Sequence, residues 1–221
     1  MLQKGFGDGD DDDATVLIVT AHPDDEAMFF VPTMLGLLSA GHRIHLLCMS
    51  TGDYEGLGEV RIKELNQCCL ELGMSPGDVT VIDHEQIRDG PKEVWDVDLL
   101  ASFVLQQTKL HPLLEMIITF DDYGVSGHPN HIAVHRAVKK VHKDICVPCH
   151  TLDSTNILRK YIGVADAPLS YKFGQWSFFH WNLLSNYKAM SAHASQFVWF
   201  RRLFVLFSRY TYINTLQPMR R

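Results

Sequence analysis

The sequence lacks an apolar run that could span a membrane: no stretch reaches the roughly 18 uninterrupted apolar residues that a transmembrane helix needs. It also shows no secretory signal peptide at its N-terminal end. It contains no Asn-x-Ser/Thr glycosylation site. We therefore expect neither a membrane-spanning helix nor a secretory leader in this sequence, and the missing glycosylation sites agree with a chain that faces the cytosol.

Cysteine is scarce, and its count of five is odd. An odd count in a chain of this length excludes a disulfide framework and fits a reducing compartment. The stretch CVPC (146–149) lies near His142 and His150, so a zinc knuckle is one interpretation. No second Cys-x-x-Cys completes the four ligands of such a site, so free core thiols are the favoured interpretation.

Acidic and basic residues are spread unevenly along the chain. The net charge of −6 argues against a nucleic-acid-binding protein. The segment from Ala167 to Arg221 has seven Lys or Arg and no Asp or Glu, whereas the 166 residues before it have 13 basic and 26 acidic side chains. A basic, aromatic-rich segment on an acidic body suggests an anionic partner for that segment.

The N-terminal residues 1–14 differ in composition from the rest of the chain. They contain the run DGDDDDA (8–14), which lacks the glycine and terminal glutamate placement of a calcium-binding loop. We expect a solvated, disordered leader there. Residues 15–221 have the length of one domain, and a chain of this size buries roughly 70% of the surface of its unfolded form.

Apolar segments of two kinds alternate along residues 15–153. Short β-branched runs such as TVLIVT (15–20) are typical of strands covered on both faces, and longer amphipathic segments between them are typical of helices. This alternation predicts an α/β protein: a Rossmann-like, doubly wound, mostly parallel sheet in a single domain. We expect strands at 15–20, 43–50, 78–83, 115–120 and 149–153, and helices at 27–40, 59–73, 94–110 and 129–142.

Two polar segments follow two of the predicted strands. AHPDDE (21–26) follows the strand 15–20, and DDYGVSGHPNH (121–131) follows the strand 115–120. In the common strand order 3-2-1-4-5 these two strands are neighbours at the topological switch point, where α/β sheets bind ligands. Two loops about 100 residues apart are therefore expected to meet in one crevice.

The side chains of these loops suit a metal site. A catalytic zinc takes three protein ligands and leaves one position open. His22 and Asp25 supply two ligands from one loop, and His131 supplies a third. The neighbouring Asp24 could take a proton from a water, and His128, three residues before His131, could face a developing oxyanion or protonate a leaving amine.

Simpler interpretations exist for each motif taken alone. An Asp-Asp-Glu after a strand is often a solvated loop or helix cap, and a His-x-x-His is usually one face of a surface helix. The occurrence of both motifs at the predicted switch point favours a site. Two interpretations remain open for several residues: Asp121 and Asp122 either orient ligands or cap the loop, and His135 is either a supporting residue or a surface residue. The other histidines without a partner pattern are expected to be structural: His42, His45, His111, His180 and His193.

At this point the motifs resemble a known family. AHPDDE followed much later by GHPNH is similar to the LmbE-like superfamily of metal-dependent N-deacetylases, and within it to the PIG-L branch. The resemblance covers nearly the whole chain beyond the acidic leader. It rests on the stretches AHPDDEAMFF, STGDYEGLG, RIKEL, TFDDYGVSGHPNH, STNILRKY and WFRRLFVLFSRY.

The resemblance implies roles for the residues already singled out. It implies zinc bound by His22, Asp25 and His131, with Asp24 as the general base and His128 as an electrostatic or acid catalyst. His and carboxylate ligands also suit Fe²⁺ or Mn²⁺. The three acids and the histidine of AHPDDE then tolerate one another because a divalent cation lies among them.

The resemblance also implies a substrate contact at Arg61, near a phosphate or an inositol. Glu64, on the same turn of the predicted helix, would hold that arginine or form a surface salt bridge, and these two interpretations are equally supported.

The PIG-L branch removes the acetyl group from N-acetylglucosaminyl-phosphatidylinositol, an early step of glycosylphosphatidylinositol (GPI) anchor synthesis on the cytosolic face of the endoplasmic reticulum. Its animal members carry an N-terminal membrane-spanning helix, whereas the first 14 residues here read MLQKGFGDGDDDDA. Two alternatives remain: a relative that deacetylates a soluble amino sugar, and a non-catalytic sugar or nucleotide binder on a Rossmann-like sheet. The missing GxGxxG after the first strand disfavours the second.

The segment 195–214 has the length of a helix and is rich in aromatic and aliphatic residues. One interpretation is a helix packed on the sheet with its arginines at the rim. The other is a segment lying on the membrane surface, with arginines at anionic headgroups and aromatic side chains at the interface. The polar stripe consists of Arg201, Arg202, Ser208 and Arg209, and the interfacial aromatics would be Trp199, Tyr210 and Tyr212.

Overall fold

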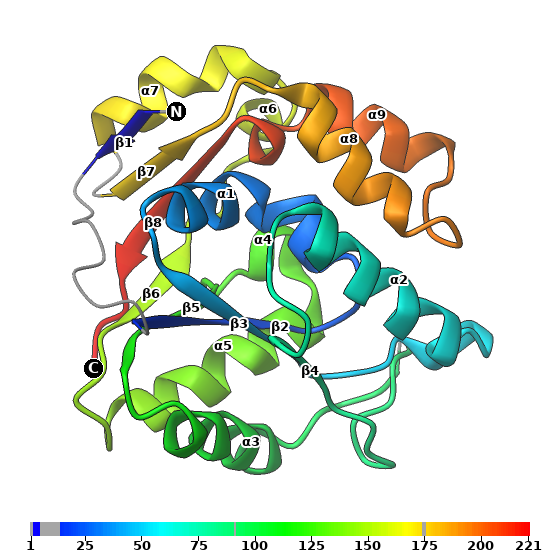
Figure 1. Cartoon of the computed structure of the whole chain (residues 1–221), viewed down its shortest axis with the longest axis vertical. Coiled ribbons are helices and arrows are strands. Elements are labelled where there is room, and N and C mark those ends of the chain that lie inside the picture. The colour runs from blue at the N-terminus through cyan, green and yellow to red at the C-terminus, as the bar shows by residue number, and fades with distance from the viewer. Residues whose placement is uncertain (1, 5–13, 91, 174–175) are drawn as a thin grey trace.

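The computed structural model describes residues 2–4, 14–90, 92–173 and 176–221, which form one eight-stranded sheet with helices on its two faces (Figure 1). The strand order is β1-β7-β8-β6-β5-β2-β3-β4. Five of these strands are parallel to one another, and their order β4-β3-β2-β5-β6 is the predicted 3-2-1-4-5 arrangement. The parallel strands are β2 (Thr15–Thr20), β3 (Arg43–Cys48), β4 (Val79–Val81), β5 (Leu114–Phe120) and β6 (Cys149–Leu152).

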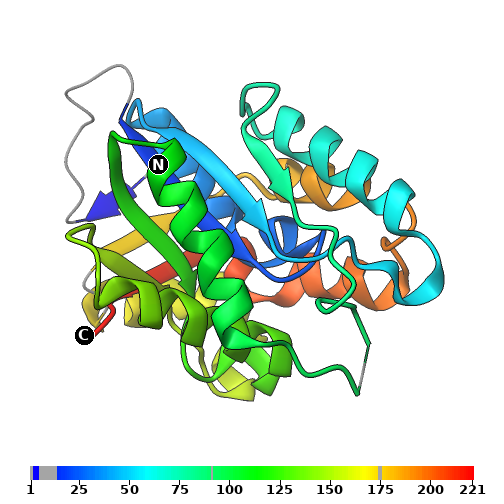
Figure 2. The ribbon, with the colours of Figure 1, turned by 90° about the horizontal axis from the view of Figure 1, so that it is seen from below.

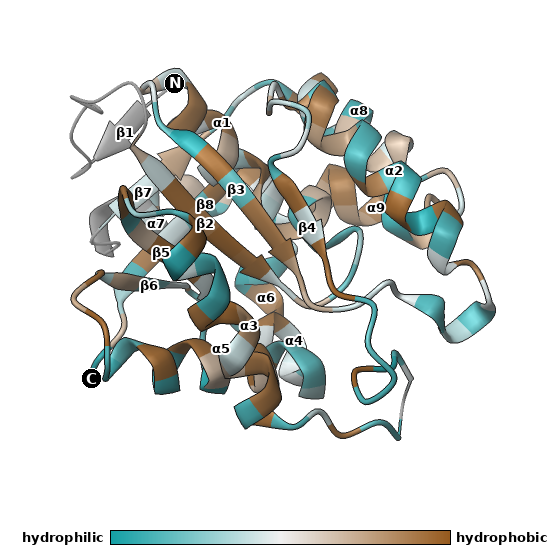
Figure 3. Cartoon of the chain, turned by 60° about the horizontal axis from the view of Figure 1, so that its bottom comes forward, coloured by the Kyte–Doolittle hydropathy of each residue, from teal (hydrophilic) through white to brown (hydrophobic). Residues whose placement is uncertain are grey.

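The core lies around the central strands. Every residue of β2 is buried, and β3 and β5 each have a single exposed residue, which agrees with strands that helices cover on both faces. Figure 3 shows the apolar colouring of β2 and β3 through the middle of the sheet. The mostly parallel Rossmann-like prediction is confirmed.

Helices α3 and α5 pack together on one face of the sheet, and Figure 2 shows α3 in front of the strands. Helices α1 and α2 lie on the other face, where α2 also packs against α8. The chain enters α1 through a π-helical turn, η1, a geometry that is often found at functional sites. The bounds are η1 (Glu26–Phe30), α1 (Val31–Ser39), α2 (Gly58–Glu71), α3 (Val97–Leu110), α5 (Pro129–His142) and α8 (Leu183–Ala192).

Two strands from the last third of the chain, β7 and β8, together with β1 from its N-terminal end, extend the sheet in antiparallel pairings that the sequence pattern did not predict. Strand β8 pairs with β6 and with β7, and β7 pairs with β1. Short helices cover the connections between these strands. The bounds are β1 (Leu2–Lys4), α4 (Gly124–Gly127), α6 (Ile157–Lys160), α7 (Ala167–Phe173), β7 (Trp176–Phe179), α9 (Trp199–Phe207) and β8 (Ile213–Pro218), with short 3-10 turns η2 (Asp53–Glu55), η3 (Gly163–Asp166) and η4 (Arg209–Thr211).

The single helix predicted over 195–214 is wrong at both ends, because α9 spans only Trp199–Phe207. Helix α9 ends at Phe207, and Ser208 has an extended backbone whose side chain accepts a hydrogen bond from the backbone N–H of Tyr210. The chain then makes the turn η4 and enters β8. The helix ends before Arg209 because the side chain of Arg209 is fully buried in the core, where its Nε lies 2.9 Å from Asp166 Oδ2.

Of the predicted disordered leader, residues 2–4 form β1 and Ala14 is buried, whereas residues 1 and 5–13 lie outside the described residues, and for these disorder stays a prediction. None of the helices in the described parts of the chain has both the length and the apolar composition needed to cross a membrane. The five cysteines are free thiols: Cys146 is exposed, and the other four are buried. Among the described residues no cluster of metal-ligating groups includes Cys146 or Cys149, so the zinc-knuckle interpretation finds no support.

Candidate active site

The loops that follow β2 and β5 meet, as predicted, at the carboxyl ends of these neighbouring strands. His131, in the first turn of α5, places its Nε2 3.1 Å from Asp25 Oδ1. His22 Nδ1 lies 3.8 Å from Asp25 Oδ2. All three side chains are buried. The structure thus brings together the three residues that were predicted as metal ligands.

The orientation of His131 is fixed from two sides. Its Nδ1 lies 3.1 Å from the backbone carbonyl oxygen of Gly124, and its ring stacks on Phe120 with centroids 4.0 Å apart. Gly124 has a φ of 63°, and a Cβ added there would lie 2.8 Å from the Cβ of His131. This close approach requires glycine at position 124 and directs Nε2 of the imidazole toward Asp25.

His22 is held by residues from two other segments of the chain. The amide nitrogen of Asn130 lies 2.9 Å from His22 Nε2, and Asp89 Oδ1 lies 3.4 Å from the same atom. Burial works to lower the pKa of His22, but the hydrogen bond and charge of Asp89 and the charge of Asp25 outweigh it and raise that pKa. Asp89 is therefore part of the site.

The carboxylate of Asp25 is kept ionised. Burial works to raise its pKa, but the adjacent His131 and His22 outweigh burial and lower it far below the usual value. Oδ2 also accepts hydrogen bonds from the backbone N–H groups of Ala21 and His22, at 3.0 and 2.8 Å. An ionised, buried carboxylate beside two imidazoles suits a metal ligand.

His128 lies at the N-cap of α5, where its Nδ1 accepts a hydrogen bond from the backbone N–H of Asn130 at 3.3 Å. Its ring centroid is 4.7 Å from that of His131 and 5.0 Å from that of His22. Burial, together with the neighbouring imidazoles, lowers the pKa of His128 to about 4. A neutral ring whose Nδ1 accepts a hydrogen bond carries its proton on Nε2, so His128 can donate from Nε2 into the cavity.

Asp24 has a backbone conformation that few non-glycine residues adopt, with a φ of 113°. The conformation is held because the backbone N–H of Asp24 donates to Glu26 Oε2 at 3.1 Å, and its carbonyl accepts from the N–H of Met28 at 2.9 Å. Glu26 is in turn bound by His193, whose Nε2 lies 2.5 Å from Glu26 Oε1, and both of these side chains are completely buried. The strained turn places the Asp24 carboxylate beside two arginines.

Those arginines come from distant parts of the chain. Arg201 of α9 places Nη1 2.8 Å from Asp24 Oδ2, and Arg61 of α2 places Nη2 3.6 Å from Oδ1. Gln196 fixes Arg201 by accepting hydrogen bonds at its backbone and side-chain oxygens, at 3.0 and 2.8 Å. Burial raises the pKa of Asp24, and the two arginines only partly oppose that shift. A carboxyl with a raised pKa in a cavity is suited to accept a proton.

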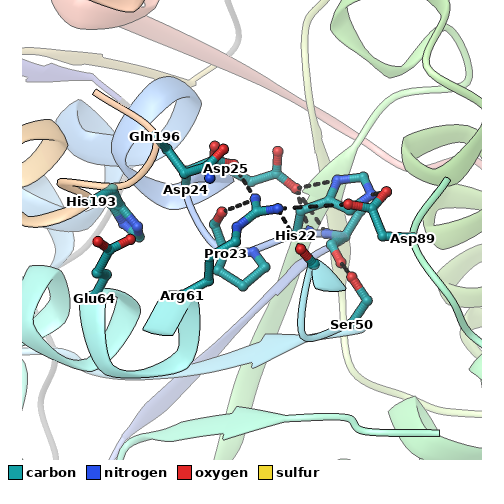
Figure 4. A network of polar contacts seen from close by, with 12 residues as sticks. His22, Pro23, Asp24, Asp25, Ser50, Arg61, Glu64, Asp89, His193 and Gln196 are labelled. Atoms are coloured by element: carbon teal, nitrogen blue, oxygen red, sulfur yellow. Dashed lines mark hydrogen bonds and ion pairs between the residues drawn. The ribbon is translucent and has the colours of Figure 1, made fainter. Parts of the chain in front are cut away.

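Arg61 is held mainly by backbone oxygens. Its guanidinium donates to the carbonyls of Gly52 and Pro23, at 2.8 and 2.6 Å, and lies 3.6 Å from Asp89 (Figure 4). Gly52 has a φ of 67°, and a Cβ there would lie 2.5 Å from the guanidinium carbon. The glycine in STGDYEGLG thus makes room for Arg61.

Glu64 does not hold Arg61, and it does not form a surface salt bridge. Its two carboxylate oxygens accept hydrogen bonds from the backbone N–H and the hydroxyl of Ser195, at 2.7 and 2.6 Å. Both earlier interpretations of Glu64 are therefore wrong. Its contact ties α2 to the segment that carries Gln196 and leads into Arg201.

Of the residues left open near the second loop, Asp121 and His135 have structural contacts. Asp121 accepts hydrogen bonds from the backbone N–H of Gly124 at 2.9 Å and of Ser154 at 2.6 Å, so it caps the loop. Asp122 is exposed. His135 is buried behind the site, with Nδ1 3.0 Å from the carbonyl oxygen of Phe120. His193 is one of the five histidines predicted to be structural. It binds Glu26, which in turn accepts a hydrogen bond from the backbone of Asp24, so His193 supports the site.

Two residues of the site, Asp89 and Arg201, were missed as site residues. Asp89 lies in the long loop after β4 and has no local pattern around it. Arg201 was assigned to a polar stripe at the membrane surface, but its side chain points into the site. Arg209 of the same stripe is in the core, so a surface formed by Arg201, Arg202 and Arg209 does not exist.

These side chains line a cavity of about 320 Å³ at the edge of the sheet. The ring nitrogens of His22, His128 and His131 lie within 4.8 Å of one another, and Asp25 adds an ionised oxygen beside them. Imidazole and carboxylate donors in this number fit a divalent ion such as zinc. The lining residues are His22, Asp24, Asp25, Met28, Phe29, Tyr54, Glu55, Arg61, Asp89, Ser126, His128, His131, Gln196 and Arg201.

Comparisons with known proteins show a family match and a relative that aligns with most of the chain. The family model described as "PIG-L: GlcNAc-PI de-N-acetylase" matches residues 17–142. A bovine N-acetylglucosaminyl-phosphatidylinositol de-N-acetylase is 44% identical over 207 residues, which cover 90% of this chain and 81% of the bovine protein.

Solved structures share the fold at low sequence identity. The N,N'-diacetylchitobiose deacetylase of Pyrococcus horikoshii superposes with a TM-score of 0.68 at 14% identity, covering 93% of this chain and 84% of that one. The zinc-inhibited form of the teicoplanin deacetylase Orf2 superposes with a TM-score of 0.63 at 13% identity, covering 92% and 97%.

Proposed function

The chain belongs to the PIG-L family of GlcNAc-PI de-N-acetylases, and from that premise we propose that it hydrolyses the acetamide of N-acetylglucosaminyl-phosphatidylinositol. The products would be acetate and glucosaminyl-phosphatidylinositol. The observation that carries the proposal is the convergence of His22, Asp25 and His131 from two loops, with Asp24 directed into the same cavity.

A divalent metal would be held by His22, Asp25 and His131. We propose zinc, while the same donors also accept Fe²⁺ or Mn²⁺. When bound, such an ion supplies Lewis-acid chemistry, polarising a carbonyl and lowering the pKa of a water to near neutrality.

The neighbouring residues would move the protons. Asp24 takes a proton from the attacking water and passes it to the amide nitrogen as the C–N bond breaks, so that the sugar leaves as the amine. Its carboxylate lines the cavity, and burial raises its pKa. His128 donates a hydrogen bond from Nε2 to the oxygen that becomes negative as the amide carbonyl is attacked. Arg201 orients the Asp24 carboxylate through its 2.8 Å contact, and Arg61, which lines the cavity, contacts the substrate.

The same proposal implies a place in the cell. Deacetylation of this glycolipid is an early step of GPI-anchor synthesis, so the chain would act at the endoplasmic reticulum membrane, on its cytosolic face. The surface that would contact the membrane is the apolar face of α9, since Trp199, Phe200, Leu203 and Phe207 are all exposed. These apolar side chains replace the arginine stripe as the proposed contact.

The proposal is tested by measuring acetate release from N-acetylglucosaminyl-phosphatidylinositol by the purified, metal-supplemented chain. A soluble N-acetylated amino sugar that lacks the lipid serves as the comparison. We expect turnover of the glycolipid at a kcat/KM well above that of the soluble sugar. Turnover of the soluble sugar alone would point instead to a soluble-sugar deacetylase, and turnover of neither would refute deacetylation.

A further inference from the structure

Lys160, in the stretch STNILRKY, has a partly buried ammonium group without an anionic partner. Among the described residues none forms an ion pair with it, and its nearest interactions are with the rings of Tyr161 and Phe204, whose centroids lie 5.8 and 5.9 Å from Nζ. Burial lowers the pKa of Lys160, with no opposing charge. A partly desolvated cation with no counter-ion is a favourable place for an anionic ligand.

Lys160 lines a second cavity that continues from the active-site cavity. This groove, of about 520 Å³, shares Met28, Phe29, Ser126 and Arg201 with the active-site cavity. Its remaining wall is apolar apart from Lys160 and comes from the end of α6 and from α9: Tyr161, Phe200, Leu203, Phe204 and Phe207.

The groove opens onto an unusually apolar part of the surface. Helices α6 and α9 both contact the turns η3 and η4 and lie near each other at the same end of the molecule (Figure 1). Their outward side chains are strongly exposed although they are apolar, a pattern that marks interaction surfaces. The exposed fractions are 73% for Ile157, 76% for Leu158, 72% for Trp199 and 54% for Phe207.

We propose that this groove binds the phosphatidyl part of the glycolipid, with the phosphodiester at Lys160 and the first segments of the acyl chains along α9. The assignment rests on the proposed function, which supplies the glycolipid. The groove joins the active-site cavity at Met28, Phe29, Ser126 and Arg201, and beyond these shared residues it offers Lys160 and the apolar wall of α9. In the substrate the acetamido sugar is linked through inositol to the phosphodiester, and the phosphodiester to the acyl chains, so a ligand whose acetamide lies in the active-site cavity can place its phosphate and acyl chains in the adjoining groove.

The test compares three substrates: N-acetylglucosaminyl-inositol, its 1-phosphate without acyl chains, and the complete phosphatidylinositol lipid. For Lys160→Gln we expect kcat/KM to fall by about tenfold with each of the two phosphate-containing substrates, the loss typical of one charge-assisted hydrogen bond. The loss with the phosphate-free substrate should be several-fold smaller. Lys160→Arg should recover most of the activity because it keeps the charge.

Lys139→Gln, at an exposed position on α5 that lines neither the active-site cavity nor the groove, is the matched control and should behave as wild type with all three substrates. An equal loss with all three substrates for Lys160→Gln, or no loss, would overturn the phosphate assignment. A loss confined to the acylated substrate would overturn it too.

The acyl-chain part is tested with the pair Leu203→Ser and Phe207→Ser, both on the exposed wall of the groove. We expect these variants to lower kcat/KM for the complete lipid by several-fold more than for the acyl-free phosphate. Leu110→Ser, on α3 and 62% exposed, is the apolar control. Equal effects on both substrates would overturn the acyl-chain assignment. A wild-type chain that hydrolyses none of the three substrates would instead refute the proposed function, so the two failures are distinguishable.

Discussion

Replacing Arg209 by Gln should destabilise the fold severely, although the residue lies in a segment that looks amphipathic in sequence. Its side chain is fully buried, with Nε 2.9 Å from Asp166 Oδ2 and Nη2 2.8 Å from the Ser170 hydroxyl. Asp166 is also completely buried and is shared with Arg159, whose Nε lies 2.6 Å from Oδ1. Arg209 therefore holds one half of a buried charge cluster that joins η3 to η4.

The size of the effect follows from that burial. Removing one partner of a buried, hydrogen-bonded ion pair costs about 3–5 kcal/mol, because the other charge is left without compensation. Arg159 still faces Asp166 in the variant, which places the expected loss near 3 kcal/mol. For a domain of this length 1 kcal/mol corresponds to about 2–4 °C in Tm, so the Tm should fall by about 6–12 °C.

The assay is urea unfolding followed by circular dichroism, with Arg202→Gln as the matched control. Arg202 is exposed, and its guanidinium carbon lies 5.2 Å from the ring centroid of Phe197. Its replacement should change the free energy of unfolding by less than about 0.5 kcal/mol. An Arg209→Gln variant as stable as wild type, or one that only loses affinity for vesicles, would refute the buried position of Arg209.

The other predictions concern the site. We expect the wild-type chain to bind about one divalent ion, and His22→Ala and His131→Ala should each lose most of it when metal content is measured by elemental analysis. The control His135→Gln should keep the ion, because His135 lies outside the ligand cluster. Full metal content in both ligand variants would refute the ligand assignment. Arg201→Gln should lower kcat/KM by roughly tenfold or more, because the 2.8 Å contact with Asp24 is lost. Its loss of stability should be much smaller than that of Arg209→Gln. Turnover equal to that of Arg202→Gln would contradict the role of Arg201 in orienting Asp24.

The parallel half of the fold could be predicted because its apolar sequence runs coincide with strands that are buried on both faces. The run TVLIVT has only β-branched and aliphatic residues between polar loops, and β2 spans those same residues. Pro129 at the predicted helix start is the first residue of α5. The two polar loops then had to meet, since the strand order places β2 beside β5.

The C-terminal part could not be predicted from local patterns. The stretch FVWFRRLFVLFSRY contains no glycine or proline to end a helix. The break at Ser208 comes from tertiary contacts, because the buried Asp166 binds Arg209. The same limit applies to the site: Asp89 and Arg201 reach it from a long loop and from α9, and no sequence spacing links either of them to His22 or Asp24.

The central claim is that Asp24 is the base and Asp25 a metal ligand, within one dipeptide. Parallel measurement of metal content and acetate release for Asp24→Asn and Asp25→Asn tests it most directly. Asn suits position 24 because it tolerates the positive φ and keeps the side-chain shape. We predict that Asp24→Asn retains its metal while kcat falls by roughly 10²–10⁴-fold, and that Asp25→Asn loses the metal. Loss of metal in Asp24→Asn with retention in Asp25→Asn would contradict the account.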